Sequence, residues 1–532
     1  MDNFRAELNL ALKNILENNK DKAIEILKNI ISKDDKNFIS FFYLGNIFSE
    51  KQNYELSKKY LNQAISIKPN FPEAYNTLGV LYLNLRKFVE AEQSLNKAIE
   101  INQNNPDPYN NLGLLKREQN DILSAKNFFN KAIDINDKFF PAYINLMELY
   151  ERTNQNDLLN EIIKKSEVVF SNNKVIKLYK GKLNYKKKNY SKTIETLQQL
   201  NFNDSEIVFE KSRLLNLAKS FDKIGSYEDA FNHFKKMNDI SLIDASLISN
   251  RNAYNSNVES RKKYLASLDK IPWVETKLSS HEGPVFMIGF PRSGTTLLDS
   301  ILRSHPDIEI IEEKPIVEEL IFKLKHFNCD DLESLNKLTD NDLKELQNIY
   351  FEKRKSYLDS NINSKIIIDK LPLNTIYVTE ILRVFPNAKL IFSLRHPYDC
   401  VLSSYFQNFK LNSSMSNFLK LEDAANFYNK VMEIWTKNKI IFKPDVCELK
   451  YEDLVLSFEE SIKKVLDFLE IQWSDELYNF NKTSKARRIN TPSYYQVTEP
   501  INNKAIFRWK NYTNQITNIK PIINYWIDYY KY

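Results

Sequence analysis

The first half of the chain repeats one pattern of apolar and small residues with a period of 34 positions. Leu-Gly pairs occur at 44–45, 78–79 and 112–113, and Leu146 followed by Met147 continues the series. Other positions keep the same period: the aromatic residues Phe41, Tyr75, Tyr109 and Tyr143, the large residues Leu61, Leu95 and Phe129, and the alanines Ala64, Ala98 and Ala132. A 34-residue unit of this kind forms two helices joined by a turn, with small residues where the helices approach closely.

This pattern resembles the tetratricopeptide repeat. Residues 3–36 form an imperfect first copy, residues 148–205 keep helical periodicity without the consensus, and a copy returns near Leu217. We therefore predict an α-solenoid domain over residues 1–240 and a helical or irregular connector over residues 241–280. Repeat arrays present extended binding surfaces, so one interpretation is a groove that binds a peptide or protein. The other is a scaffold that packs against the second domain or mediates self-association.

The second half changes to short apolar runs that alternate with helical patterns. Strands are predicted over residues 285–289, 365–369, 388–394 and 446–449, and helices over residues 295–304, 375–385, 397–408 and 458–469. This alternation indicates a parallel sheet covered by helices on both faces. The predicted fold class is therefore an α domain followed by an α/β domain over residues 281–532. Ligands bind beyond the carboxyl ends of such strands, where the loops at 291–296, 370–373 and 395–399 would lie.

Glycine is concentrated around the loop that follows the first predicted strand. The chain has 8 glycines in 532 residues, yet Gly283, Gly289 and Gly294 fall within twelve positions. A strand, a glycine loop and a helix start together form an anion cradle from backbone N–H groups. The glycine spacing matches a Walker A loop, but Thr295 stands where the lysine is expected, and Arg292 lies inside the loop. This favours phosphate binding without the NTPase apparatus; a kinase or other NTPase and a purely structural glycine turn are the alternatives.

Composition narrows the function classes only a little. The chain is 42% hydrophobic and 27% charged with a net charge of +6, and it has no basic-aromatic stripe of the kind that nucleic-acid binding needs. Its 3 cysteines are widely spaced and form neither a metal pattern nor a disulfide framework. No apolar run is long enough for a membrane span, and the first residues lack an apolar signal core. These features predict a cytoplasmic protein without a metal, a nucleic-acid partner or a membrane span.

Three loops of the second half together resemble the sulfotransferase family, whose members transfer a sulfuryl group from 3′-phosphoadenosine 5′-phosphosulfate (PAPS). The resemblance spans residues 284–512, and with the repeats it is similar to bacterial proteins that fuse tetratricopeptide repeats to a domain related to tyrosylprotein sulfotransferases. It implies a P-loop-like fold with PAPS as co-substrate. The first motif is PRSGTT at residues 291–296, the 5′-phosphosulfate loop of the family. By this resemblance the 5′-phosphate is held by Arg292, Ser293, Gly294, Thr295 and Thr296, and Arg292 also stabilises transition-state charge.

The second motif begins at Arg395. The resemblance implies that Arg395 and Ser403, eight residues later, bind the 3′-phosphate, for which the paired donors of arginine are suited. The alternative is an ion pair between Arg395 and Asp399 that caps the following helix. Three further positions resemble cofactor contacts near the nucleotide or in the C-terminal loop, with ordinary packing as their alternative: Tyr451, Ser493 and Arg508.

The third motif concerns the general base. Small-molecule members of the family use a histidine in the segment that matches residues 369–372, where this chain has none. The tyrosylprotein enzymes use a glutamate after a His-Pro pair, and counting without gaps from the loop arginine places Glu313 at that position, after His305-Pro306. Glu313 would deprotonate an acceptor hydroxyl; Glu312 is the second candidate, and a solvated helix face is the alternative for both. Lys370 matches a lysine that contacts the transferring group, with a surface lysine as its alternative.

The sequence thus predicts a PAPS-dependent sulfotransferase in which Glu313 is the base and Arg292 and Lys370 stabilise the transition state. A protein or peptide hydroxyl, bound through the tetratricopeptide groove, is the favoured acceptor, and a carbohydrate or small metabolite is left open. The alternative from another class is a repeat-based interaction scaffold with an inactive, nucleotide-binding sulfotransferase-like domain.

Overall fold

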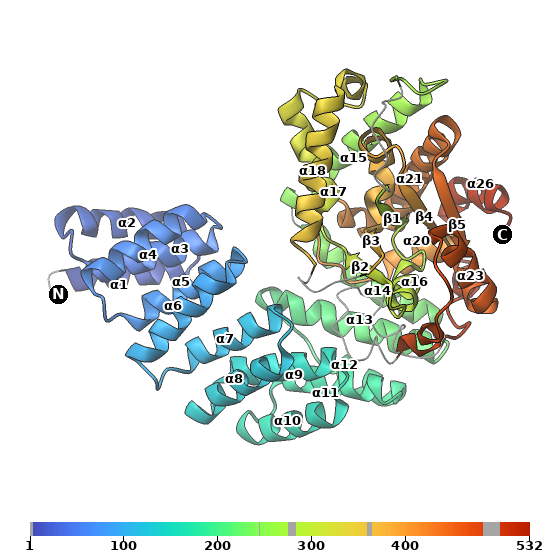
Figure 1. Ribbon diagram of the computed structural model, residues 1–532. Helices are drawn as coiled ribbons and strands as arrows, with labels where there is room; N and C mark the ends of the chain where they lie inside the picture. Colours follow the sequence, from blue (N-terminus) through green and yellow to red (C-terminus); the bar gives the residue numbers. More distant parts are fainter. Residues whose placement is uncertain (1–3, 244, 275–282, 359–363, 482–500) are drawn as a thin grey trace. The chain divides into compact units, whose positions relative to one another are not determined.

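The computed structural model describes residues 4–243, 245–274, 283–358, 364–481 and 501–532. They form two compact units, residues 1–188 and residues 189–532, which are treated separately (Figure 1). The first unit is built from paired helices, and the second combines helices with a parallel sheet. The predicted fold class, an α-solenoid followed by an α/β domain, is confirmed.

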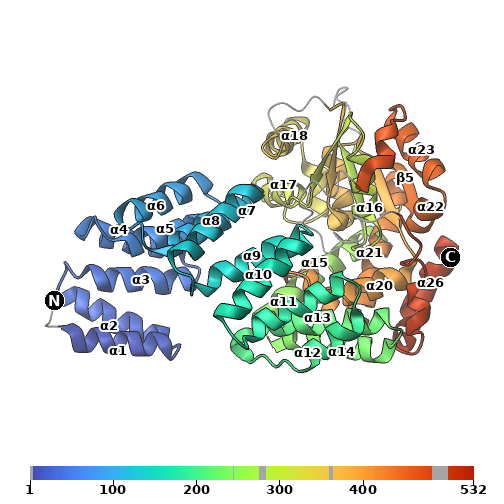
Figure 2. The same ribbon diagram turned by 90° about the horizontal axis from the view of Figure 1, so that it is seen from below.

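The helices of the first unit follow one another as antiparallel hairpins (Figures 1 and 2). Their bounds are α1 (Arg5–Leu16), α2 (Lys20–Lys33), α3 (Phe38–Glu50), α4 (Tyr54–Ile67), α5 (Pro72–Asn84), α6 (Phe88–Ile101), α7 (Pro106–Glu118), α8 (Ile122–Ile135), α9 (Phe140–Arg152), α10 (Asn156–Val169) and α11 (Lys174–Lys186). The imperfect first repeat predicted over residues 3–36 corresponds to the α1–α2 hairpin. Each hairpin buries the apolar stripe of both of its helices, which is how amphipathic helices form a core.

The repeated glycines let the two helices of a hairpin pack closely. A Cβ atom built on the glycine would lie 2.7 Å from Leu61 at Gly45, 2.6 Å from Leu95 at Gly79 and 2.5 Å from Phe129 at Gly113. Real Cβ atoms do not approach a neighbour this closely, so a larger residue would force the helices apart. The large apolar partners are those that share the 34-residue period of the sequence.

The period of the repeat continues beyond the part of the sequence that keeps the consensus. The first helix of each hairpin is followed by a residue with φ between 56° and 65°: Asn18, Gln52, Arg86, Asn120, Asn154 and Lys188. These residues lie 34 positions apart. A left-handed residue just past the last turn is a common way to end a helix. The backbone therefore repeats regularly up to residue 188, although the consensus has faded after residue 148.

The second unit begins with α-helices that precede the sheet in the sequence. They are α12 (Tyr190–Gln198), α13 (Ile207–Lys223), α14 (Tyr227–Asp239) and α15 (Ala245–Ala266). Helices α13 and α14 form the hairpin predicted near Leu217, but they pack on the α/β part: Phe234 stacks on Phe406 with ring centroids 4.1 Å apart, and Asn238 Nδ2 donates to the Tyr405 carbonyl at 2.9 Å. The compact units accordingly divide at residue 188, whereas the domain boundaries at 240 and 280 stay a prediction.

Five parallel strands form the sheet of the second unit in the order β2-β3-β1-β4-β5. Their bounds are β1 (Val285–Gly289), β2 (Ile308–Glu312), β3 (Ile366–Lys370), β4 (Lys389–Leu394) and β5 (Asp445–Lys450). β1 lies at the centre and is buried along its whole length, as its unbroken apolar run predicts. Because all strands are parallel, the loops that follow β1, β2, β3 and β4 meet at one edge. The edge strand β2 was not predicted.

Helices cover both faces of this sheet, and their bounds are α16 (Thr295–Leu302), α17 (Ile316–Leu324), α18 (Asp340–Lys355), α19 (Val378–Val384), α20 (Pro397–Tyr405), α21 (Leu421–Phe442), α22 (Tyr451–Leu456), α23 (Phe458–Leu469) and α26 (Lys520–Tyr530). Met287 of β1 packs in the core formed with α16, α22 and α23. On the other face Phe286 contacts Tyr350 of α18, and Phe392 of β4 stacks on Trp435 of α21 with ring centroids 4.0 Å apart. Neighbouring strand residues therefore serve two separate cores.

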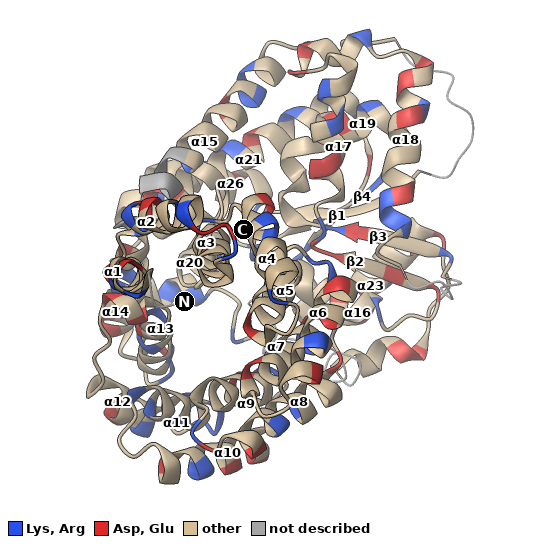
Figure 3. Ribbon diagram, turned by 90° about the vertical axis from the view of Figure 1, so that its left-hand side faces the viewer, with Lys and Arg blue, Asp and Glu red and all other residues tan. Residues whose placement is uncertain are grey.

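Charged side chains of both signs are interspersed along the helices of the first unit (Figure 3). Some join neighbouring hairpins, as Lys51 does with Asp21 at 2.6 Å, and such exposed pairs contribute little stability. Within the part of the chain that the structure describes, no helix combines the length and apolar character needed to cross a membrane.

Candidate active site

The loop between β1 and α16 has the backbone geometry of an anion cradle. Gly294 has φ 103°, in the left-handed region, and precedes the first residue of α16. A Cβ atom on Gly294 would also lie 2.7 Å from the ring of Tyr451. Ser293 is buried, and its hydroxyl has no hydrogen-bond partner among the described residues. The loop therefore leaves a helix N-terminus and a buried hydroxyl available to an anion.

We expect Gly294→Ala to destabilise the second unit by more than the roughly 1–2 kcal/mol that a left-handed alanine costs, because the methyl group would also overlap Tyr451. The change in the free energy of unfolding can be measured by denaturant titration with tryptophan fluorescence. All 5 tryptophans lie between residues 273 and 526, so this signal reports on the second unit alone.

The control for this variant is Gly225→Ala. Gly225 has φ 84°, and a Cβ atom there would meet nothing within 4 Å, so the variant reports left-handed strain without overlap. Equal destabilisation by the two variants would contradict the packing argument for Gly294.

Arg395 contacts Arg292, which is part of the glycine loop. Arg292 Nε donates to Ser403 Oγ of α20 at 3.0 Å. Arg395 directly follows β4. Its Nη1 donates to the Arg292 carbonyl at 3.2 Å, and its guanidinium lies over the Tyr451 ring, 4.8 Å from the centroid. Arg395 also lies 3.9 Å from Asp399, so the ion pair considered as its alternative is present. That pair leaves Arg395 Nε without a hydrogen-bond partner among the described residues.

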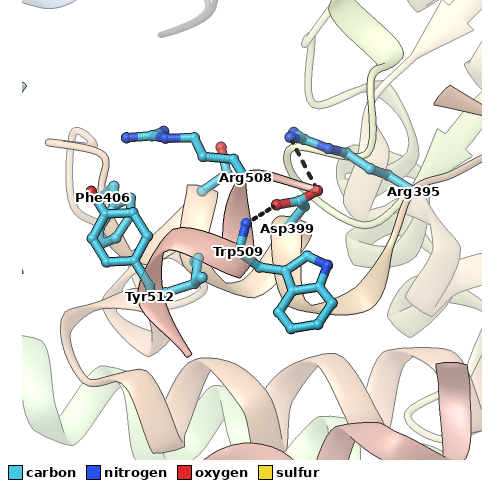
Figure 4. Close-up of a pocket in the computed structure, with 8 residues that line it drawn as sticks. Arg395, Asp399, Phe406, Arg508, Trp509 and Tyr512 are labelled. Atoms are coloured by element: carbon cyan, nitrogen blue, oxygen red, sulfur yellow. Dashed lines mark hydrogen bonds and ion pairs between the residues drawn. The ribbon is translucent and has the colours of Figure 1, made fainter. Parts of the chain in front are cut away.

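Arg508 is the third arginine at this edge of the sheet. It begins the short helix η9 (Arg508–Tyr512) and lines a pocket with Arg395, Asp399, Leu402, Ser403, Phe406, Trp509 and Tyr512. In Figure 4 the guanidinium groups of Arg395 and Arg508 lie along the same edge of the view, and the Asp399 carboxylate lies below that of Arg395, joined to it by a dashed line. Asp399 accepts a hydrogen bond from the Trp509 backbone N–H at 2.8 Å, which joins η9 to α20.

The positive charges of these arginines act on one another. Burial, and then the charges of Arg395 and Arg508, lower the pKa of Arg292 to about 10. Three guanidinium groups gathered at a partly buried site repel one another, and Asp399 and Asp222 compensate only part of their charge. The arrangement is therefore suited to a multiply charged anion, and arginine is the side chain best shaped to bind phosphate.

A second cluster of charge lies at the ends of β2 and β3. Lys370 is fully buried, and its Nζ lies 3.1 Å from Glu313, 3.5 Å from Glu312 and 3.8 Å from Asp299 of α16. Burial lowers the pKa of Lys370, but these three carboxylates outweigh burial and leave it raised. The alternative of a surface lysine is wrong, since the side chain has 0% exposure.

Glu313 sits directly beyond the end of β2 in a left-handed conformation with φ 50°. Its backbone N–H donates to the Lys370 carbonyl at 2.8 Å, and its side chain is 36% exposed. The alternative of a solvated helix face is wrong for Glu312 and Glu313, because Glu312 ends a strand and both carboxylates contact Lys370. Asp299 of α16, the helix that follows the glycine loop, lies 3.8 Å from Lys370 Nζ and connects this cluster to the loop.

The structure thus brings together most of the residues singled out from the sequence. The loop residues, Tyr451, Arg395, Ser403 and Arg508 form one group, and Glu313 and Lys370 form the second. Ser493 lies outside the described residues. The sequence did not indicate Asp299, although a carboxylate within the apolar run TTLLDSIL was a usable signal. It also did not indicate Asp222, whose Oδ1 lies 2.8 Å from Arg508 Nη2.

His396, which follows Arg395, packs among aromatic rings and is not placed as a general base. Its ring is stacked on Tyr398 and Trp509, and its backbone N–H donates to Glu452 at 3.0 Å. Burial and the neighbouring cations Arg395 and Lys510 lower the pKa of His396 to about 4. The histidine is therefore neutral near pH 7 and contributes packing.

Comparison with family models agrees with this architecture. Residues 284–475 match the model described as the sulfotransferase family. Tetratricopeptide-repeat models match residues 21–85, 72–105 and 106–139. The chain therefore carries tetratricopeptide repeats and a sulfotransferase domain, and both resemblances drawn from its motifs are confirmed.

Similar curated proteins each match less than half of this chain. An uncharacterised protein of Aquifex aeolicus is 32% identical over 250 residues, covering 45% of this chain and 32% of that protein. The protein-tyrosine sulfotransferase of Drosophila melanogaster is 27% identical over 237 residues, covering 42% of this chain and 46% of that protein. The matches thus span a third to a half of these relatives. Among solved structures, the sulfotransferase domain of the Synechococcus PCC 7002 olefin synthase is 20% identical with a TM-score of 0.32, covering 44% of this chain and 91% of that chain.

Proposed function

We propose that this protein transfers a sulfuryl group from PAPS to an acceptor hydroxyl, with Glu313 as general base. The observation that carries the proposal is the gathering of Arg292, Arg395 and Arg508 beside the glycine loop that begins α16, the helix whose Asp299 contacts Lys370 next to Glu313. A donor with phosphate groups at two positions would add negative charge to this cluster, in which Asp399 lies 3.9 Å from Arg395 and Asp222 lies 2.8 Å from Arg508. The match of residues 284–475 to the sulfotransferase family supports sulfuryl transfer as the type of reaction.

The residues present fit such a donor. Ser293 Oγ and Arg395 Nε are buried polar atoms without partners among the described residues, and buried polar groups are normally hydrogen-bonded. Arg292, Ser293, Thr295 and Thr296 would hold the 5′-phosphate at the N-terminus of α16. A separate set, Arg395, Ser403 and Arg508, would hold the 3′-phosphate, with Tyr451 and Ser493 as further predicted contacts.

The roles of the remaining groups follow from their positions. When bound, PAPS supplies the sulfuryl group that becomes attached to the acceptor oxygen. Glu313 would accept the proton of that hydroxyl at its partly exposed carboxylate. Lys370 would hold the Glu313 carboxylate in place. Together with Arg292 it would stabilise the negative charge that develops on the 5′-phosphate of the leaving group. No metal is required for these roles.

The acceptor class is inferred from two features. A carboxylate base after a His-Pro pair is the pattern of the tyrosylprotein enzymes, and several of the relatives found are protein-tyrosine sulfotransferases. Tetratricopeptide repeats present extended surfaces for peptides and proteins. We therefore favour a tyrosine hydroxyl of a protein or peptide, bound in part by the repeats.

Two other functions receive less support. A kinase or other NTPase would need the Walker lysine, and Thr295 occupies that position. An inactive scaffold would not need Lys370 and Glu313 held 3.1 Å apart at the edge of the sheet beside an arginine cluster.

The proposal is tested by incubating the full chain with sulfur-labelled PAPS and three acceptor pools: tyrosine-containing peptides, oligosaccharides and small phenols. We expect label in the peptide pool and none with Arg395→Ala. Label only in another pool would overturn the peptide class and keep the reaction type. A folded wild type that labels none of the pools would overturn sulfuryl transfer.

A further inference from the structure

One residue that contacts Arg508, Asp222, comes from a helical hairpin outside the matched family regions. Asp222 lies in the last turn of α13. The repeat matches end at residue 139 and the sulfotransferase match begins at residue 284, so Asp222 belongs to neither. Its Oδ1 lies 2.8 Å from Arg508 Nη2 and accepts hydrogen bonds from Arg508 Nε at 3.2 Å and from the Tyr512 hydroxyl at 2.6 Å. One carboxylate oxygen therefore holds two side chains of η9.

A carboxylate at the position of Asp222 is electrostatically unfavourable for its own helix. The C-terminal end of a helix carries partial negative charge, so a carboxylate in its last turn is destabilising unless a cation compensates it. Arg508 is that cation. The side chain of Asp222 is only 9% exposed, and a buried carboxylate requires such a partner. Burial lowers the pKa of Arg508, but the charge and hydrogen bond of Asp222 together with Tyr512 outweigh burial and leave it raised.

The surrounding contacts make the hairpin a rigid support. Phe234 of α14 stacks on Phe406 at 4.1 Å, Tyr227 contacts Tyr512 at 5.4 Å, and Phe406 lies 4.9 Å from Tyr512. The guanidinium of Arg508 lies over the Phe406 ring, 5.3 Å from its centroid, and Figure 4 shows this ring beside the head group of Arg508. Aromatic packing and the ion pair together hold Arg508 in the pocket wall that also carries Arg395 and Ser403.

We propose that Asp222 is a positioning residue for donor binding: it holds Arg508 in the phosphate site, so that the α13–α14 hairpin completes a pocket otherwise built by the sulfotransferase domain. This inference rests on the proposed function and adds a residue that acts through Arg508 without contacting the donor. A preorganised arginine binds phosphate more tightly because less side-chain entropy is lost on binding. The helical segment before the α/β domain is therefore part of the catalytic unit.

The test is calorimetric titration of the full chain with adenosine 3′,5′-bisphosphate. We expect Asp222→Asn to weaken binding by about tenfold or more, the usual effect of losing a charged hydrogen bond. Asp239→Asn is the matched control, because Asp239 is an exposed carboxylate at the end of the neighbouring helix α14 and should bind as wild type does. Thermal unfolding of each variant shows whether it is folded.

A double-mutant cycle separates positioning from general destabilisation. If Asp222 acts through Arg508, Asp222→Asn should weaken binding in the wild-type background and add no further loss to Arg508→Ala. The inference is overturned if Asp222→Asn binds as wild type does, or if its loss is the same in both backgrounds. A wild type that fails to bind the bisphosphate would overturn the proposed function itself, which distinguishes the two failures.

Discussion

Replacing Glu313 by glutamine is expected to slow sulfuryl transfer by about 10²- to 10⁴-fold, the usual contribution of a general base. Glutamine has nearly the same shape but cannot accept the proton of the acceptor hydroxyl. Donor affinity should stay close to that of wild type, because Arg292, Arg395 and Arg508 are untouched. The rate is best measured in a single turnover with labelled PAPS bound to excess enzyme, which isolates chemistry from product release.

The matched control is Glu312→Gln. Glu312 also contacts Lys370, at 3.5 Å against 3.1 Å for Glu313, and it carries the same charge one residue earlier. We expect a much smaller loss from this variant, because Glu312 is the last residue of β2 and its side chain is only 9% exposed. A large loss in Glu312→Gln with little effect in Glu313→Gln would show that the base has been assigned to the wrong glutamate.

Replacing Lys370 by methionine is expected to destabilise the second unit by about 3–5 kcal/mol, the cost of removing one partner of a buried ion pair. Asp299, Glu312 and Glu313 all lie within 3.8 Å of Lys370 Nζ. Without the lysine, these carboxylates repel one another at a site that is largely shielded from water. Tryptophan fluorescence during denaturant unfolding measures the change in the second unit, as described for Gly294→Ala.

Lys389→Met provides the comparison. Lys389 also lies on a strand and pairs with Glu470 at 2.6 Å, but Glu470 is 79% exposed, so its loss should cost at most about 1 kcal/mol. Adding Glu313→Gln to Lys370→Met should recover part of the lost stability, because it removes one of the stranded charges. Equal destabilisation by the two lysine variants would contradict the role given to the buried cluster.

The repeats and the central strands could be predicted because their physical requirements are local. A glycine every 34 residues, opposite Leu61, Leu95 or Phe129, is needed wherever two helices pack this closely. The runs at β1, β3 and β4 are apolar because central strands are buried on both faces. The position of the loops at 291–296, 370–373 and 395–399 at one edge followed from the same reasoning, whereas the 3′-phosphate role proposed for Arg395 and Ser403 came from the resemblance to sulfotransferases.

The elements that were missed have mixed patterns. β2 reads IEIIE, with glutamates at 309 and 312, and it is an edge strand that buries only part of its surface. Five residues of alternating character can be read as one turn of an amphipathic helix as easily as a strand. Its identity depends on pairing with β3, which the local sequence does not contain.

The residues around the site that were missed depend on contacts distant in the sequence. Asp222 is one of many acidic residues in a helix, and its meaning comes from Arg508, 286 positions later. Asp299 has the appearance of a single polar residue in an apolar helix until Lys370, 71 positions later, is seen to lie 3.8 Å from it. A motif identifies which residues contact a ligand, whereas the residues that hold them in place are found only from the fold.

The most direct test of the account is calorimetric titration of wild type and Arg395→Ala with adenosine 3′,5′-bisphosphate. If the three arginines form a PAPS site, wild type should bind in the micromolar range. Arg395→Ala should lose most of that affinity while remaining folded, because the buried guanidinium supplies paired donors to phosphate. A folded wild type that does not bind the bisphosphate would contradict the central claim.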